Sequence, residues 1–208
     1  MASLPKSKIL NTSAGFQDRF IQVTANEAHK HGKGGDHRHT GTAFTTWLDF
    51  KQAEQQAAAI RDELIRLLPN SKHAIGNNFV DLQKNLQALD SKLTDIATKY
   101  GETPLVGSHP VYQYLARGYD LKIRSVHWEP HEMPAEEGWA ELKAIRKEHP
   151  AKIMLWEGEP DKAIALKLIH GGVSSVVFNP GGNKSDEGDW LSVIQANISQ
   201  LGSVAPEK

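Results

Sequence analysis

The second half of the chain alternates short apolar segments with amphipathic segments four times. Each apolar segment is four or five residues long, and most are rich in Val, Ile or Leu, which is typical of buried strands. The strands are predicted at residues 104–107, 123–126, 152–156 and 174–178, and the helices that follow them at residues 110–119, 134–148, 161–169 and 190–201. Because strands that alternate with helices form parallel sheets, the sequence predicts an α/β fold with a parallel four-stranded sheet and helices on both faces.

Two further helices are predicted before the first strand. Apolar residues recur at helical spacing over residues 53–68, where Pro69 ends the run. A longer apolar stripe begins at about Asn77 and stops at Tyr100. At 1.5 Å per residue the second helix would be about 35 Å long, which is more than one small lobe needs.

Charge and composition exclude several classes of partner. The chain carries 24 basic and 25 acidic residues, so no excess of positive charge is present to neutralise a phosphate backbone, and we expect no nucleic-acid partner. No apolar run approaches the roughly 18–20 residues that span a bilayer. Residues 1–8 lack the apolar core of a signal peptide, so we expect that the protein stays inside the cell or that the chain begins downstream of a leader.

The chain contains no cysteine. This excludes disulfides, thiolate catalysis and cysteine-based zinc sites, so any metal ion must be held by His, Asp or Glu.

His and Glu residues stand where the predicted strands end, which is where parallel sheets bind ligands. His109 follows the first strand and Glu157 follows the third, and imidazole with carboxylate suits zinc or manganese. The alternatives are that His109 caps a helix or packs on Trp or Tyr, and that Glu157 caps a helix or pairs with Lys. A polar loop after the second strand offers three weaker candidates: Glu129, His131 and Glu132. The remaining histidines outside residues 29–39 are predicted to be surface or partly packed residues: His73, His127, His149 and His170.

Residues 29–39 include four histidines and no apolar residue. The glycines among them predict a mobile loop, because such a segment has no face to bury. Imidazoles on this loop, from His29, His31, His37 and His39, can capture metal weakly and release it readily. The alternative is a loop that is merely solvated.

Common catalytic motifs are absent from the sequence, including the nucleophile elbow, the Walker loop and the His-Glu-x-x-His zinc motif. A small metallohydrolase built around His109 and Glu157 would need a third protein ligand and an open position. No third ligand is evident, so we expect a protein that is not an enzyme.

Several motifs occur together in a recognisable order. They are Thr45-Thr46-Trp47-Leu48-Asp49, the long helix, the run from Ser108-His109-Pro110 to Leu115-Ala116-Arg117, Trp128-Glu129-Pro130, Trp156-Glu157 and Asp189-Trp190-Leu191. From about Lys8 to Leu201 the chain resembles the zinc and manganese substrate-binding proteins of bacterial ABC transporters, the ZnuA-like or TroA-like cluster A-I. The resemblance implies reversible binding of Zn²⁺ (or Mn²⁺) for delivery to a membrane permease, and a periplasmic or cell-surface location.

The resemblance also implies a metal site between two lobes with four ligand positions. His109 matches the third position, Thr45 falls on the second, and Asn179 falls near the fourth. The first position lies in the N-terminal lobe of the family. It matches no residue here, because most of that lobe has no counterpart in this chain. On this interpretation His37 and His39 could serve where Thr45 cannot; the alternative is a degenerate stand-alone scaffold without an inter-lobe site.

The same resemblance divides the chain into four parts. Residues 1–50 are a remnant of the N-terminal lobe with the His-rich loop, residues 51–101 a helical segment with the inter-lobe helix, residues 102–202 the C-terminal α/β lobe, and residues 203–208 a tail. A lobe without its partner leaves an apolar face exposed, which predicts self-association through that face.

Overall fold

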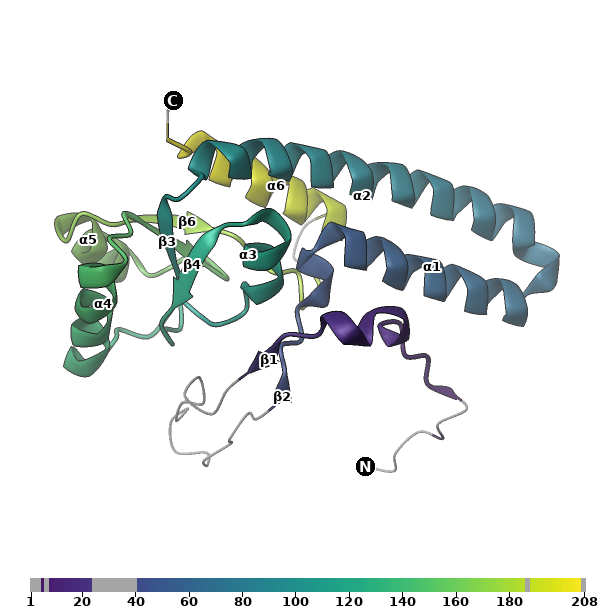
Figure 1. Cartoon of the computed structure of the whole chain (residues 1–208), viewed down its shortest axis with the longest axis horizontal. Helices are drawn as coiled ribbons and strands as arrows, with labels where there is room; N and C mark the ends of the chain where they lie inside the picture. The colour runs from purple at the N-terminus through teal and green to yellow at the C-terminus, as the bar shows by residue number, and fades with distance from the viewer. Residues whose placement is uncertain (1–4, 6–7, 24–40, 186–187, 207–208) are drawn as a thin grey trace.

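A computed structural model describes residues 5, 8–23, 41–185 and 188–206 of the 208-residue chain. Its centre is a sheet of four parallel strands in the order β4-β3-β5-β6. The strands are β3 (Pro104–Gly107), β4 (Lys122–Ser125), β5 (Ile153–Trp156) and β6 (Ser174–Val177). Each begins and ends within one residue of its predicted position, and the α/β prediction is confirmed (Figure 1).

Alternating residues of the strands build two hydrophobic cores, one on each face of the sheet. Leu105 and Leu155 face a core formed with α2 (Lys72–Tyr100), α3 (Gln113–Tyr119) and α6 (Trp190–Ser203). Their neighbours Val106 and Met154 face a second core formed with α4 (Glu136–Glu148) and α5 (Lys162–His170). Helices therefore cover both faces of the sheet, as expected where parallel strands are buried on both sides.

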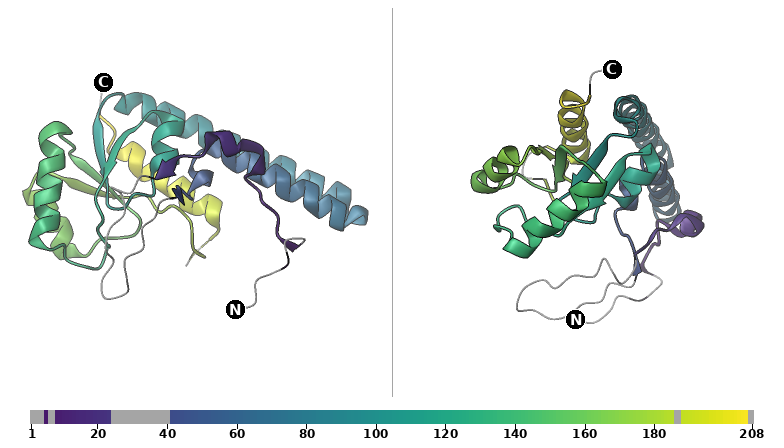
Figure 2. Two further views of the ribbon diagram at one scale, coloured as in Figure 1. Left: turned by 60° about the horizontal axis from the view of Figure 1, so that its bottom comes forward. Right: turned by 60° about the vertical axis from the view of Figure 1, so that its left-hand side comes forward.

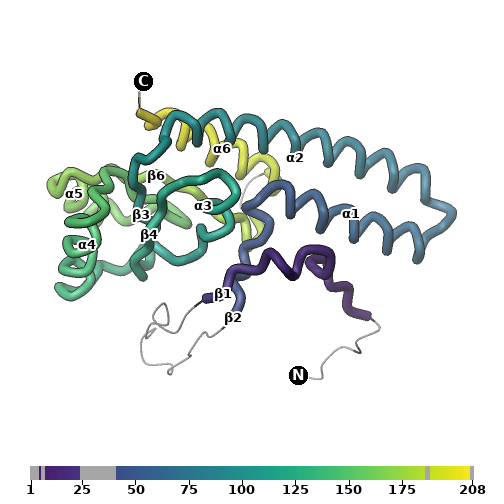
Figure 3. The backbone as a smooth tube through the Cα atoms, in the orientation of Figure 1, coloured from purple at the N-terminus to yellow at the C-terminus, as the bar shows by residue number. Residues whose placement is uncertain are grey.

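The helical hairpin formed by α1 (Phe50–Leu67) and α2 (Lys72–Tyr100) extends well beyond the sheet (Figures 1 and 3). With 29 residues, α2 is about 43 Å long. The helix begins at Lys72, five residues before its predicted start at about Asn77. The apolar stripe from which the start was predicted does not include the first turn of the helix. The buried residues of α2 all lie from Leu86 onward, where the helix packs on the core of the sheet. Along the hairpin α2 contacts α1. Among the described residues, no helix is both long enough and apolar enough to cross a membrane.

The chain before α1 runs along the hairpin and the sheet. A 3₁₀ helix (Ala14–Arg19) precedes β1 (Gln22–Val23), which pairs antiparallel with β2 (Gly41–Thr42). A second 3₁₀ helix (Thr46–Leu48) then leads into α1. Figure 2 shows this segment beside the hairpin, away from α4 and α5.

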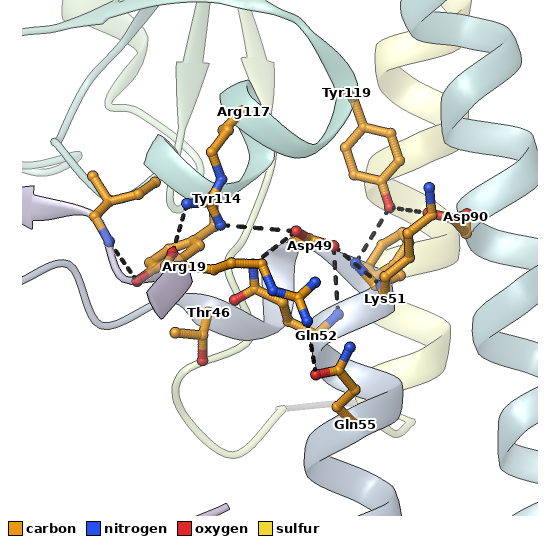
Figure 4. A network of polar contacts seen from close by, with 12 residues as sticks. Arg19, Thr46, Asp49, Lys51, Gln52, Gln55, Asp90, Tyr114, Arg117 and Tyr119 are labelled. Atoms are coloured by element: carbon orange, nitrogen blue, oxygen red, sulfur yellow. Dashed lines mark hydrogen bonds and ion pairs between the residues drawn. The ribbon is translucent and has the colours of Figure 1, made fainter. Parts of the chain in front are cut away.

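Asp49 fixes the point where α1 begins (Figure 4). Its carboxylate accepts hydrogen bonds from the backbone N–H groups of Lys51 and Gln52, which the first turn of a helix leaves without partners. The side-chain amide of buried Gln52 donates to the same carboxylate at 2.8 Å. Arg117 of α3 approaches it at 4.0 Å and also donates to the backbone of Arg19 at 2.6 Å. Asp49 thereby links the start of the hairpin to α3, and Arg117 links α3 to the segment that ends in β1.

Candidate metal-binding site

The strand order places a topological switch point (the crevice) at the carboxyl ends of β3 and β5. The chain leaves β3 through α3 on one face of the sheet and leaves β5 through α5 on the opposite face. Two adjacent strands whose connections diverge in this way leave a gap at which α/β proteins bind ligands. His109 lies two residues after β3, and Glu157 lies directly after β5. The two strongest sequence candidates therefore lie at the same crevice.

The side chains of His109 and Glu157 face each other across this crevice. Nδ1 of His109 is 3.6 Å from a carboxylate oxygen of Glu157 and 3.9 Å from one of Glu129. Both distances exceed the usual hydrogen-bond length. They are close to the roughly 3.4 Å that separates two ligand atoms around a tetrahedral zinc ion with bonds of about 2.1 Å. The spacing of His109 and Glu157 therefore fits two adjacent ligands of one ion.

The crevice is partly shielded from water, which changes its electrostatics. The side chain of His109 is 16% exposed and that of Glu157 30% exposed. Burial raises the pKa of the Glu157 carboxyl; His109, when charged, opposes this rise, and the negative charge of Glu129 adds to it. A partly buried carboxylate beside an imidazole gains from a bound cation, because the cation offsets the cost of burial.

Tyr112 is close enough to Glu157 to feel its charge, but its hydroxyl is engaged elsewhere. It is fully buried, and its hydroxyl donates to the backbone carbonyl of Phe178 at 2.9 Å. Burial, together with the nearby charge of Glu157, raises the pKa of Tyr112 well above its ordinary value. Its phenol therefore stays protonated and is not available as a metal ligand.

The structure also places the histidines that follow β4. The His127 ring contacts the His109 ring edge-on, with 5.5 Å between centroids. His127 is predicted from the sequence only as a surface or partly packed residue, without this contact. Its position directly after the apolar end of a strand could have indicated that it lies beside His109. His131 pairs instead with Asp161 at 3.1 Å, where both side chains are exposed. Glu132 is exposed on the same loop.

The expected second and fourth ligand positions line a pocket of about 790 Å³ that Glu157 also lines. The hydroxyl of Thr45 donates to the backbone carbonyl of Val111 at 2.6 Å. The side-chain oxygen of Asn179 accepts from the backbone N–H of Gly181 at 2.8 Å. Thr45 and Asn179 therefore share a pocket with Glu157, and each of the two side chains is engaged in holding the backbone.

A complete coordination shell is not formed by the residues that the structure describes. Within residues 5, 8–23, 41–185 and 188–206, no three His, Asp or Glu side chains are arranged so that they could enclose a metal ion. The predicted metal-capturing histidines, His29, His31, His37 and His39, lie outside the described residues.

Comparison with known proteins identifies the family to which the chain belongs. The model of the family described as "Zinc-uptake complex component A periplasmic" (ZnuA) matches residues 2–204. The "High-affinity zinc uptake system protein ZnuA" of Bacillus subtilis (strain 168) is 24% identical over a match of 162 residues that covers 74% of this chain and 51% of that protein. The chain thus spans about half the length of this curated relative.

Solved structures share the fold. The metal-dependent lipoprotein YcdH of Bacillus subtilis superposes with a TM-score of 0.71 at 23% identity, over 82% of this chain and 67% of YcdH. The Zn(II)-bound ZnuA-like domain of Streptococcus pneumoniae AdcA has a TM-score of 0.71 at 22% identity, over 89% of this chain and 70% of that domain. At identities of 22–23%, this similarity shows a shared fold alone.

Proposed function

The chain belongs to the family of periplasmic zinc-uptake components described as ZnuA, and from this premise we propose that it binds Zn²⁺ reversibly for delivery to a membrane permease of an ABC transporter. The observation that carries the proposal is the 3.6 Å approach of His109 and Glu157 at the crevice between β3 and β5. Zinc is favoured over manganese because both the family and the B. subtilis relative are named for zinc uptake.

His109 supplies one imidazole ligand, and Glu157 supplies either a second ligand or a carboxylate that orients His109. A carboxylate beside a ligating histidine fixes the ring and strengthens its bond to the metal, so both roles make Glu157 important for affinity. Two protein ligands hold zinc weakly by comparison with the four of a closed structural site. Further ligands must therefore join when the ion binds.

We assign the missing ligands to the histidine-rich segment, with His37 and His39 as the nearest candidates. His39 precedes pocket-lining Thr45 by only six residues, a span of at most about 20 Å. β1 and β2 bring the two ends of the intervening segment together at the Val23–Gly41 pair. His29 and His31 lie farther along the segment and serve to recruit the ion.

The cycle of capture and release requires no covalent chemistry. A structural zinc site with four protein ligands releases its ion slowly, whereas a site completed by a loop loses ligands one at a time. We infer that the protein is a carrier and not an enzyme, located in the periplasm or at the cell surface as the family name indicates. Residues 102–202 then form the C-terminal lobe, residues 51–101 the helical link and residues 1–50 part of the first lobe.

Self-association is a further part of this proposal. Apolar side chains are exposed along the free end of the hairpin, at Ile60, Leu64 and Leu67 of α1 and at Val80 of α2. A second copy of the chain that covered this surface would remove the apolar area from water. Sedimentation should therefore reveal dimers, and a strictly monomeric chain at high concentration would contradict this part.

Zinc titration by calorimetry tests the function. The metal-free protein should bind one Zn²⁺ tightly, His109→Ala should abolish that binding, and Glu157→Gln should weaken it. A variant without residues 29–39 should bind more weakly and release zinc faster. The matched control is His73→Ala, because His73 is exposed on α2 far along the hairpin. If His109→Ala leaves zinc binding intact, the chain is instead a scaffold with a metal-capturing tail.

A further inference from the structure

A groove between α4 and α5 lies at the opposite end of the sheet from the candidate metal site. Its volume is about 400 Å³. Arg146 of α4 marks its position, because its guanidinium donates to the carbonyls of Ala151 and Gly171, in the segments that lead into β5 and β6. The groove therefore opens beside the amino ends of the strands, whereas His109 and Glu157 lie at their carboxyl ends. In Figure 1 the two helices form the end of the molecule opposite the hairpin.

The floor of the groove is apolar. Leu142 of α4 and Leu168 of α5 are buried beneath it, and Val173 closes its end. Trp139 forms one wall and is held in place, since its indole N–H donates to the carbonyl of Pro134 at 3.0 Å. A floor of this kind accepts an apolar side chain from a binding partner.

The rim of the groove is basic. Four cationic side chains line it: Lys143, Arg146, Lys147 and Lys167. No Asp or Glu lines the groove, although α4 itself contains four Glu residues. In the part of the chain that the structure describes, none of the four cations forms an ion pair, whereas Arg124 of β4 pairs with Glu148 of α4.

Two of these cations are already fixed in position. The two backbone hydrogen bonds of Arg146 hold its guanidinium at the rim. Lys167 lies over the Trp139 ring with its Nζ 4.2 Å from the centroid. Groups that are fixed before binding lose little conformational freedom when a partner arrives. The groove thus combines an apolar floor with four cationic side chains, two of which are already held in place.

We propose that this groove binds an acidic segment of a partner protein, which inserts one or two apolar side chains into the floor and pairs its carboxylates with the basic rim. Charge complementarity selects an anionic occupant, since four cations surround the floor without an acidic neighbour. The concave shape selects a peptide over a flat lipid surface, because 400 Å³ accommodates side chains that protrude from a chain. The position far from the crevice lets such a partner remain bound while zinc enters or leaves.

Fluorescence anisotropy with a defined peptide tests the proposal on the full chain. The probe is a labelled 12-residue peptide of alternating Glu and Leu with a central Phe, together with one analogue that has Gln for Glu and another that has Ser for Leu and Phe. The test variant is Lys143→Gln/Lys147→Gln. The control is Lys51→Gln/Lys72→Gln, which changes net charge equally at two exposed lysines of the hairpin. Circular dichroism confirms that both variants are folded.

The parent peptide should bind wild type and control alike and should bind the test variant about tenfold more weakly. Both analogues should also bind more weakly than the parent. Equal weakening in the control, or full binding of the Ser analogue, would overturn the proposal by showing charge attraction alone. Retention of the chain on phosphatidylglycerol vesicles, without binding of the peptide, would overturn it in favour of a membrane surface.

Discussion

Replacing Asp49 by Ala should destabilise the protein more than any ordinary surface substitution. The substitution removes the acceptor for the backbone N–H groups of Lys51 and Gln52 at the start of α1, and the acceptor for the buried side-chain amide of Gln52. It also removes the carboxylate that faces Arg117 (Figure 4). One side chain thus serves a helix cap, a buried amide and an ion pair.

The magnitude follows from these three contacts. Loss of the cap costs about 1 kcal/mol. Leaving the Gln52 amide buried without its acceptor costs about 1–3 kcal/mol. The ion pair adds little, since its atoms are 4.0 Å apart and Arg117 is 39% exposed. Full addition of the cap and the amide would give a loss of about 2–4 kcal/mol. Because neighbouring contacts do not add fully, we expect a loss in the lower part of this range.

Urea titration monitored by circular dichroism measures this loss. Asp49→Ala should lower the midpoint and leave the slope unchanged, and Asp49→Asn should lose less because Asn caps helices about as well as Asp. The exposed Asp62 of α1 provides a control, and Asp62→Ala should change stability by less than about 0.5 kcal/mol. The reasoning is refuted if Asp49→Ala costs under about 1 kcal/mol or if Asn is as damaging as Ala.

Three further predictions concern single residues. Burial raises the pKa of Tyr100 to about 12 from an ordinary 10.0, so the folded state holds the phenol proton more tightly than the unfolded state does. The stability that this provides is complete below about pH 10 and is lost as the pH rises to about 12. Urea titrations at about pH 9 and pH 11 should show a smaller alkaline loss in Tyr100→Phe; an unchanged loss would contradict this. Gly181→Ala should lower the melting temperature, because φ is 69° and a Cβ would lie 2.5 Å from the Trp190 ring; calorimetry that finds no change would count against that close contact. Gly107→Ala should weaken zinc binding about tenfold, because a Cβ two residues before His109 would lie 2.8 Å from the Tyr112 ring and displace one of them. An unchanged zinc affinity in a titration would show that the packing of Gly107 against Tyr112 does not affect the metal site.

The sheet was largely predictable from the sequence because buried parallel strands are continuous apolar runs, such as residues 153–156. The first turn of α2 was not, since residues 72–76 pack on no core and carry no apolar stripe. Periodicity records which face is buried, so a helix end that projects from the fold leaves no such signal.

The candidate site was predictable in part. The residue types at the strand ends pointed to His109 and Glu157, but their 3.6 Å approach depends on β3 lying beside β5, and strand order is not readable from local patterns. The contact of His127 with His109 depends on the same order. The role of the histidine-rich segment stays a prediction, since residues 29–39 lie outside the described part of the chain.

An anomalous-difference map at the zinc absorption edge, from crystals of the zinc-loaded protein, tests the central claim most directly. We predict one strong peak about 2.0–2.2 Å from a ring nitrogen of His109, beside the Glu157 carboxylate and within reach of an imidazole from residues 29–39. A strong peak elsewhere on the chain, with none at the crevice between β3 and β5, would contradict it.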